Sequence, residues 1–245
     1  MINDHVIQVT EVLGRTTQGI TEPFLCRGDD GALYYAKGRA AGRKSLVSEW
    51  LASSLAREFG LPIAPFAVGE VDDAIVQFGA PELADLGAGY VFLSRRAESV
   101  MEFTWLNIQE VPLVVRSDVL IFDYWVRNQD RILTDLGGNP NLLWDPTRKE
   151  LVVIDFNQAF DTDFDCDTFF SSHAFAGSWD HVFEDLIERQ HYEDRLHAAL
   201  GQLEGICDRM PDSWWWLDDD LPLNFSQDDA SSILTEYLPN FWSRR

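Results

Sequence analysis

Three oxygen-bearing side chains, Asp130, Asn141 and Asp155, lie close to two short apolar runs in the middle of the chain. The runs, "NLLW" and "ELVVID", are separated by "DPTRK", whose Asp-Pro start favours a turn, so we expect an antiparallel hairpin. Asn141 opens its first strand and Asp155 closes its second. Side chains directly opposite in such a ladder have β-carbons about 5 Å apart. The pattern therefore predicts that an amide oxygen and a carboxylate converge on one point.

Such a pair of oxygen donors suits a hard divalent cation. Magnesium usually takes one or two carboxylates together with phosphate oxygens and water. We therefore predict that Asn141 and Asp155 bind Mg²⁺ with a nucleotide. Asp130 enters from the loop ahead of the hairpin, where a carboxylate is placed to orient a hydroxyl group and accept its proton. Each residue alone is more often a turn cap or a strand end, but the combination predicts phosphoryl transfer.

A glycine-containing loop, "GRTTQGIT", lies between the first two predicted strands. Its glycine spacing matches the phosphate loop GxxxxGK[ST], but Ile20 stands where that motif requires lysine. A glycine loop between antiparallel strands is instead typical of protein kinases, where it covers the phosphates of ATP. On this interpretation Thr17, Gln18 and Gly19 contact ATP.

A lysine and a glutamate downstream of this loop complete the predicted nucleotide site. Lys37 ends the third predicted strand, the position from which a kinase lysine contacts the α- and β-phosphates. Glu49 lies on the helix that follows and is expected to pair with Lys37. Taken singly, Lys37 could be an exposed strand end and Glu49 a solvated helix residue. The order of glycine loop, Lys, Glu, Asp, Asn and Asp favours the nucleotide site.

The elements that position these residues change character about a third of the way along the chain. Period-two alternation predicts strands first, and helical spacing with Gly60 as a stop signal predicts helices afterwards. We therefore expect two domains, residues 1–94 and 95–245. The expected strands are 5–13, 23–27, 32–37 and 89–94, with further extended segments at 61–65 and 74–78. The expected helices are 45–59, 111–126, an amphipathic pattern over 179–210, and 228–238. The run "DSWWWLDDDLP" is expected to pack onto the helical part.

Composition narrows the classes of function. The chain has 245 residues, 46% of them hydrophobic, with 19 basic and 41 acidic residues and a formal charge of −22. Such a charge repels nucleic acid and anionic membranes, so we expect neither as a partner. Three widely spaced cysteines indicate no disulfide framework or zinc site. No signal sequence or membrane helix is evident, so a cytoplasmic protein is predicted.

Read as an ordered set, the motifs resemble those of the HipA-like serine/threonine kinases, a bacterial branch of the protein-kinase-like fold related to phosphatidylinositol 4-kinases. The resemblance covers nearly the whole chain and is carried by "TTQGITEPFLCRGDDGALYYAKG", "LVSEWLASSLAREFGLPIAP", "DYWVRNQDR", "NPNLLW" and "LVVIDFNQAF". It implies an α+β, two-lobed fold: an N-lobe with a small antiparallel sheet plus a helix, and a mostly helical C-lobe. It also implies ATP and Mg²⁺ as cofactors and phosphoryl transfer to Ser or Thr of a protein substrate. By resemblance, Lys37 binds ATP with Glu49 as its partner, Asp130 is the catalytic base, and Asn141 and Asp155 are magnesium ligands.

Departures from the family pattern leave alternatives open. The loop "RILTDLGG" after Asp130 carries extra residues, so Asn139 is a rival to Asn141 as metal ligand. Asn157 stands at the glycine position of the kinase D-F-G motif, although asparagine adopts the left-handed conformation more readily than most residues. The N-terminal region of full-length HipA toxins is not evident, which leaves a toxin role and a regulatory protein partner undecided. The alternative functions are a pseudokinase that only binds nucleotide and a small-molecule or lipid kinase.

Overall fold

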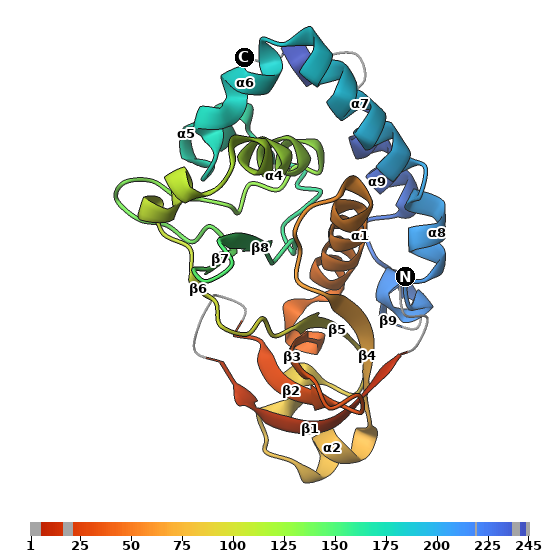
Figure 1. The fold of residues 1–245 in the computed structure, drawn as a ribbon. Coiled ribbons are helices and arrows are strands. Elements are labelled where there is room, and N and C mark those ends of the chain that lie inside the picture. The colour runs from red at the N-terminus through yellow and green to blue at the C-terminus, as the bar shows by residue number, and fades with distance from the viewer. Residues whose placement is uncertain (1–5, 17–21, 219, 237–240, 244–245) are drawn as a thin grey trace. The chain divides into compact units, whose positions relative to one another are not determined.

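The protein forms two compact units, each assembled from segments that are distant in the sequence. The computed structural model describes residues 6–16, 22–218, 220–236 and 241–243 (Figure 1). Unit 1 comprises Met1–Trp50, Ala64–Glu98 and Arg209–Phe225, and unit 2 comprises Leu51–Ile63, Ser99–Asp208 and Ser226–Arg245. Strands and helices occur together, which confirms the predicted α+β class.

Unit 1 contains the predicted small sheet, which is closed into a barrel and is antiparallel except at one strand pair. Its strands run in the order β1-β2-β3-β5-β4. Neighbouring strands are antiparallel except β1 and β4, whose parallel pairing of Ile7 with Gly69 closes the barrel. The strands are β1 (Ile7–Arg15), β2 (Phe24–Gly28), β3 (Leu33–Lys37), β4 (Phe66–Val71) and β5 (Gly89–Arg95).

The segment just after the closing strand β4 was misread from the sequence. Extended structure was predicted at 74–78, but these residues belong to helix α2 (Asp73–Phe78). The carboxylate of Asp72 accepts a hydrogen bond from the backbone N–H of Ala74 at 2.7 Å. Such an N-cap satisfies an amide at the helix start and favours a helix over a strand. A short helix α3 (Leu83–Leu86) follows before β5.

The barrel interior is the apolar core of unit 1. Aliphatic and aromatic side chains from all five strands and from α3 fill it, together with Cys26, which is fully buried. The core residues are Ile7, Val9, Phe24, Cys26, Tyr34, Ala36, Val71, Leu83, Leu86, Val91 and Leu93. This packing holds β3, and therefore its last residue Lys37, in a fixed position.

Helix α1 (Arg43–Phe59) follows β3 after the 3₁₀ turn η1 (Arg39–Ala41), as predicted. Its predicted apolar face is buried, including Trp50 and Leu55. Gly60 ends the helix with φ of +95°, the conformation expected of a glycine C-cap. The stop predicted at Gly60 is therefore confirmed.

The tryptophan-rich segment packs differently from the prediction. It contains η4 (Asp212–Trp215) and the short hairpin of β9 (Trp216–Asp218) and β10 (Leu221–Pro222). Trp214 is fully buried in unit 1, where its indole N–H donates to the carbonyl of Tyr90 at 3.3 Å and its ring meets Trp50 edge to face. The expected packing onto the helical part is wrong, because these partners lie on β5 and α1 and no local pattern specifies them.

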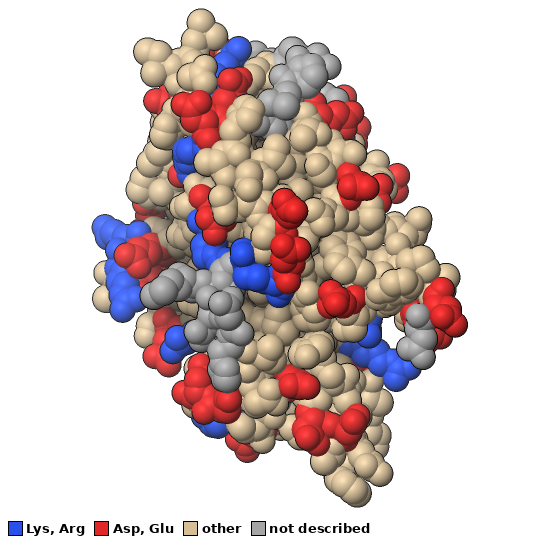
Figure 2. Space-filling view, turned by 90° about the vertical axis from the view of Figure 1, so that its right-hand side faces the viewer, with Lys and Arg blue, Asp and Glu red and all other residues tan. Residues whose placement is uncertain are grey.

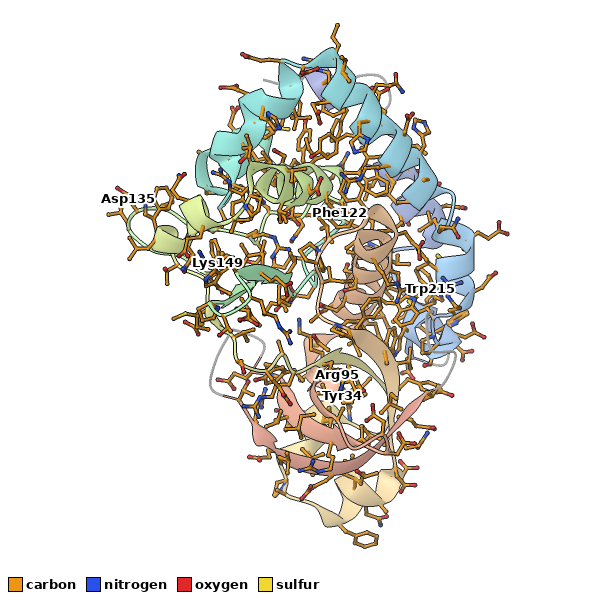
Figure 3. The ribbon with its side chains drawn as sticks, in the orientation of Figure 1. Tyr34, Arg95, Phe122, Asp135, Lys149 and Trp215 are labelled. Atoms are coloured by element: carbon orange, nitrogen blue, oxygen red, sulfur yellow. The ribbon has the colours of Figure 1, made fainter. Side chains whose placement is uncertain are left out.

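Unit 2 is organised around helix α4 (Leu113–Trp125). Every side chain from Val119 to Val126 is buried, which agrees with the predicted burial of this apolar segment. Phe122 of α4, labelled in Figure 3, packs against the rings of Phe59, Trp125 and Phe156. Buried aromatic clusters of this kind fix the orientation of a helix and the loops that leave it.

A three-stranded sheet in the order β6-β7-β8 contains the predicted hairpin. Its strands are β6 (Met101–Glu102), β7 (Leu142–Asp145) and β8 (Glu150–Val153). Asp145 caps the hairpin turn by accepting the backbone N–H groups of Thr147 and Arg148. The Asp-Pro turn predicted from the sequence is thereby confirmed, with an aspartate side chain that replaces lost backbone partners.

Short helices complete unit 2. The amphipathic pattern over 179–210 is divided into three helices, and Asp185 starts the second of them by accepting the N–H groups of Ile187 and Glu188. The helices and turns are η2 (Trp105–Glu110), α5 (Cys166–Ser172), η3 (Ala176–Ser178), α6 (Trp179–Phe183), α7 (Leu186–Leu200), α8 (Leu203–Asp208), α9 (Gln227–Thr235) and η5 (Phe241–Ser243).

On the face drawn in Figure 2, acidic side chains form several separate groups with basic side chains between them. No described helix is long and apolar enough to cross a membrane.

Candidate active site

The predicted Lys–Glu pair is present in unit 1. The Nζ atom of Lys37 lies 2.8 Å from Oε2 of Glu49, and the two residues are 8% and 2% exposed. The backbone of β3 positions the lysine, whose Cα is paired with Phe92 of β5, and the second turn of α1 positions the glutamate. A buried carboxylate of this kind holds the lysine ammonium in one orientation.

A pocket borders this lysine. Its lining includes the last residues of β3, the η1 turn and residues from β1 and β2 on either side of the glycine loop. Arg15, at the end of β1, makes ion pairs with Asp85 at 2.6 Å and with Glu22 at 3.4 Å. These contacts fix both ends of the loop. Its predicted ATP-contacting residues, Thr17, Gln18 and Gly19, lie outside the described residues.

In unit 2 the hairpin register brings the two predicted metal ligands near each other, but not directly opposite. Leu142 pairs with Val153, and the N–H of Ile154 donates to the carbonyl of Asn141 at 3.1 Å. Asn141 therefore faces Ile154, and Asp155 lies one residue further. The two residues are thus neighbours in the hairpin without being directly opposite, because β8 ends at Val153 and Asp155 lies beyond the ladder.

Both residues adopt a backbone conformation that is rare for side chains other than glycine. Asn141 has φ of +51° and Asp155 has φ of +58°. Asn and Asp are the residue types that occupy this left-handed region most readily, and non-glycine residues held there cluster at functional sites. The left-handed residue of the "DFN" turn is thus Asp155 and not Asn157, which has no positive φ.

Asn141 is turned toward Asp130. Its amide Nδ2 donates to carboxylate Oδ2 and to the backbone carbonyl of Asp130, each at 3.0 Å. Asn141 is 8% exposed, whereas Asn139 is an exposed loop residue. This arrangement joins the predicted base to a predicted metal ligand and favours Asn141 over Asn139.

The donor set fits magnesium by its chemistry. Asn141 commits its amide nitrogen to Asp130, which leaves Oδ1 as the oxygen at the other end of the amide. Asp155 supplies a carboxylate whose Oδ1 accepts the N–H of Asn157 at 3.3 Å. One carboxylate and one amide oxygen are the hard donors that Mg²⁺ shares with nucleotide phosphates and water.

A fully buried charged cluster lies directly beside these residues, and the sequence reasoning missed it. Asp123 of α4 accepts from Nε of Arg131 at 2.5 Å, from Nδ2 of Asn128 at 2.8 Å, and lies 3.0 Å from Nε2 of His173. A signal was present, because an acidic residue within the apolar run "VLIFDYWV" requires a buried partner.

The protonation of this cluster follows from its contacts. Burial alone would raise the pKa of Asp123, but the charge of Arg131 and the hydrogen bond from His173 bring the pKa below its usual value. Burial lowers the pKa of His173 more than Asp123 raises it. The Nδ1 atom of His173 also accepts the N–H of Phe175 at 3.1 Å, so the ring is neutral with its proton on Nε2.

Comparison with known proteins identifies the class. The family model described as HipA-like kinase matches residues 9–245, and the chain belongs to that family. Membership supports kinase activity in general, that is, transfer of a phosphoryl group, and it confirms the resemblance read from the motifs.

One solved structure is similar in fold. A proinflammatory kinase, CtkA, from Helicobacter pylori is similar with a TM-score of 0.52 at 12% identity, over 95% of this chain and 93% of that chain. The open conformation of CtTel1 gives a TM-score of 0.34 at 13% identity, over 90% of this chain and 11% of that one, and supports no structural argument. No curated protein sequence matches the chain.

Proposed function

We propose that this kinase transfers the γ-phosphoryl group of Mg²⁺-bound ATP to a Ser or Thr hydroxyl of a protein. The observation that carries the proposal is the cluster of Asp130, Asn141 and Asp155. The proposed base, Asp130, is hydrogen-bonded to the proposed metal ligand Asn141, and both proposed ligands, Asn141 and Asp155, have left-handed backbone conformations. We further propose that unit 1 is the N-lobe and unit 2 the C-lobe of a protein-kinase-like fold.

In the proposed reaction Asp130 acts on the acceptor hydroxyl. Its carboxylate orients the hydroxyl and takes the proton as the oxygen forms a bond to the γ-phosphorus. The bond between that phosphorus and the β–γ bridging oxygen breaks, and ADP leaves. The hydrogen bond from Nδ2 of Asn141 holds the carboxylate of Asp130 in place through Oδ2.

The other residues bind ATP. Lys37, held by Glu49 at 2.8 Å, contacts the α- and β-phosphates, and the glycine loop with Thr17, Gln18 and Gly19 covers the phosphates. Asn141 and Asp155 hold magnesium through oxygen. Bound magnesium neutralises charge on the phosphate oxygens.

The test combines labelling and binding. Purified protein is incubated with γ-labelled ATP and Mg²⁺, and mass spectrometry locates phosphate on the protein and on added protein substrates. Asp130→Asn is expected to reduce turnover by about 100-fold to 10,000-fold while ATP binding is kept. Asp155→Ala is expected to remove the magnesium-dependent part of ATP binding in calorimetry.

A matched control is available in the same loop. Asp135 is exposed, and Figure 3 shows it at the outer end of the loop that follows Asp130. Asp135→Asn makes the same chemical change and is expected to keep wild-type turnover. Equal turnover of Asp130→Asn and Asp135→Asn would refute the base assignment. ATP binding without any transfer by the wild type would identify a pseudokinase, and labelled lipid in place of labelled protein would identify a lipid kinase.

A further inference from the structure

Arg131 is completely buried beside the proposed base. It is 0% exposed, and its Nε and Nη2 atoms donate to the two carboxylate oxygens of Asp123 at 2.5 and 3.3 Å. Asp123, in the last turns of α4, is itself 0% exposed. This two-point contact fixes the plane of the guanidinium group against the most buried helix of unit 2.

The remaining nitrogen of Arg131 points at three backbone carbonyls. Nη1 donates to the carbonyl of Pro140 at 3.1 Å, of Asn141 at 2.8 Å and of Ile154 at 3.3 Å. The first two carbonyls belong to the peptide groups on either side of Asn141. The third belongs to the peptide group immediately before Asp155. One guanidinium nitrogen therefore holds the backbone at both proposed metal ligands.

These peptide groups adjoin two residues whose backbone conformation is unfavourable for a side chain other than glycine. Asn141 and Asp155 have φ of +51° and +58°. A non-glycine residue in this region costs energy and persists only where its surroundings fix the adjoining peptide planes. The carbonyls bound by Arg131 define those planes, and Arg131 is also the chain neighbour of Asp130.

We propose that Arg131 is a positioning residue for phosphoryl transfer: anchored on Asp123, it fixes the backbone at Asn141 and Asp155 and thereby the geometry of the magnesium ligands. The inference rests on the proposed function, since it assigns Arg131 to the same site. Arg131 contacts neither nucleotide nor acceptor in this role and acts through the residues it holds.

Lysine cannot perform this role. A guanidinium group presents donors in a rigid planar fork, which lets one edge bind Asp123 while another nitrogen binds the carbonyls. A lysine ammonium keeps the charge but is a single point, and it can satisfy the carboxylate or the carbonyls. Arg131→Lys therefore removes the positioning while it keeps a cation in the cluster.

Arg195 provides a matched control. Its Nη1 atom lies 2.5 Å from Asp118, and its Nη2 atom donates to the carbonyl of Phe59 at 2.8 Å. It is thus a second arginine of unit 2 that joins a carboxylate to a backbone carbonyl, but it contacts none of the proposed site residues. Arg195→Lys has a comparable structural effect without the proposed positioning effect.

The first readout uses the protein without nucleotide or metal. The amide of Ile154 donates to the carbonyl of Asn141, which also accepts from Arg131. Hydrogen exchange at that amide is expected to be at least about tenfold faster in Arg131→Lys than in wild type or Arg195→Lys. Equal exchange in Arg131→Lys and the Arg195 control would overturn the proposal.

The second readout is the response to magnesium. The Mg²⁺ concentration for half-maximal ATP binding is expected to rise about 10-fold to 100-fold in Arg131→Lys, as for other residues that orient metal ligands. Turnover is expected to fall about 100-fold, with ATP binding in the absence of Mg²⁺ unchanged. An unchanged magnesium response would overturn the proposal.

A second variant, at the anchoring carboxylate, covers the case in which Arg131→Lys does not fold. Asp123→Asn keeps the shape of the anchoring side chain and weakens its contacts with Arg131, Asn128 and His173. It is expected to shift amide exchange and magnesium response in the same direction by severalfold, and wild-type values for both would contradict the proposal. Transfer by the wild type tests the proposed function separately, because exchange at Ile154 requires neither ATP nor turnover.

Discussion

The buried pair of Lys37 and Glu49 gives the sharpest quantitative prediction. Its charged atoms are 2.8 Å apart, and the side chains are 9% and 3% exposed. At that distance and an effective dielectric constant of about 20, the attraction is about 6 kcal/mol. Desolvation of two buried charges offsets much of this attraction. Removal of one partner from a buried pair nevertheless costs about 3–5 kcal/mol, because it leaves the other charge uncompensated.

We therefore expect Lys37→Met and Glu49→Gln each to lower the free energy of unfolding by about 3–5 kcal/mol. For a chain of this size, that corresponds to a fall in Tm of roughly 6–20 °C. The double change Lys37→Met with Glu49→Leu replaces both charges by apolar groups and is expected to recover most of the loss. Urea unfolding without ATP, followed by tryptophan fluorescence, measures all four proteins.

The same proteins separate stability from function. Both proteins that lack Lys37 are expected to lose ATP binding, although the double variant is stable. Single variants that each lose less than about 1 kcal/mol would show that the pair is effectively solvated. A double variant as unstable as the sum of the single variants would show that the two side chains are not coupled, and either result would refute the reasoning.

Three further predictions concern unit 2. Burial lowers the pKa of His173, so the unfolded state binds a proton at this ring before the folded state does, and the free energy of unfolding should fall as pH drops below about 6.5. His173→Gln should flatten that part of the curve when the urea midpoint is plotted against pH. An unchanged slope would contradict a buried neutral ring. Asp118→Asn weakens the 2.5 Å ion pair with Arg195 and should lower the free energy of unfolding, measured in urea, by about 1–3 kcal/mol while turnover stays unaltered. A loss of turnover at full stability would contradict a purely structural role of this pair. A β-carbon at Gly138, where φ is +151°, would lie 2.3 Å from the carbonyl oxygen of Ile132. Gly138→Ala should therefore shift the loop between the proposed base and the proposed metal ligand and lower turnover at least about tenfold. Wild-type turnover in this variant would show that the loop does not position the site.

Local patterns in the sequence specified the elements that carry the site. Period-two alternation placed Lys37 at the end of β3, and helical spacing placed Glu49 on the following helix with its end at Gly60. The Asp-Pro turn predicted the hairpin that carries Asn141. These features depend on residues within a few positions of one another, so a single sequence reveals them. The ordered motifs then sufficed to identify the HipA-like kinase family, which the family model confirms.

Non-local contacts determined most of the remainder. Sequence reasoning also misread one local signal, the N-cap at Asp72, which makes residues 74–78 helical despite their apolar alternation. It placed the tryptophan segment on the helical part, whereas Trp214 finds its partners on elements more than a hundred residues earlier in the chain. Barrel closure by β1 and β4 likewise joins strands that are distant in sequence.

The sequence by itself determined which residues could do chemistry, and only the tertiary structure decided how they are held. Asp123, Arg131 and His173 are ordinary polar residues in the sequence, and they become one buried cluster because α4, the loop after it and the end of α5 fold around them. The left-handed conformations of Asn141 and Asp155 depend in the same way on carbonyls fixed from outside their own segments. A charge can be buried, or a rare backbone conformation kept, only when groups distant along the chain supply the compensating hydrogen bonds.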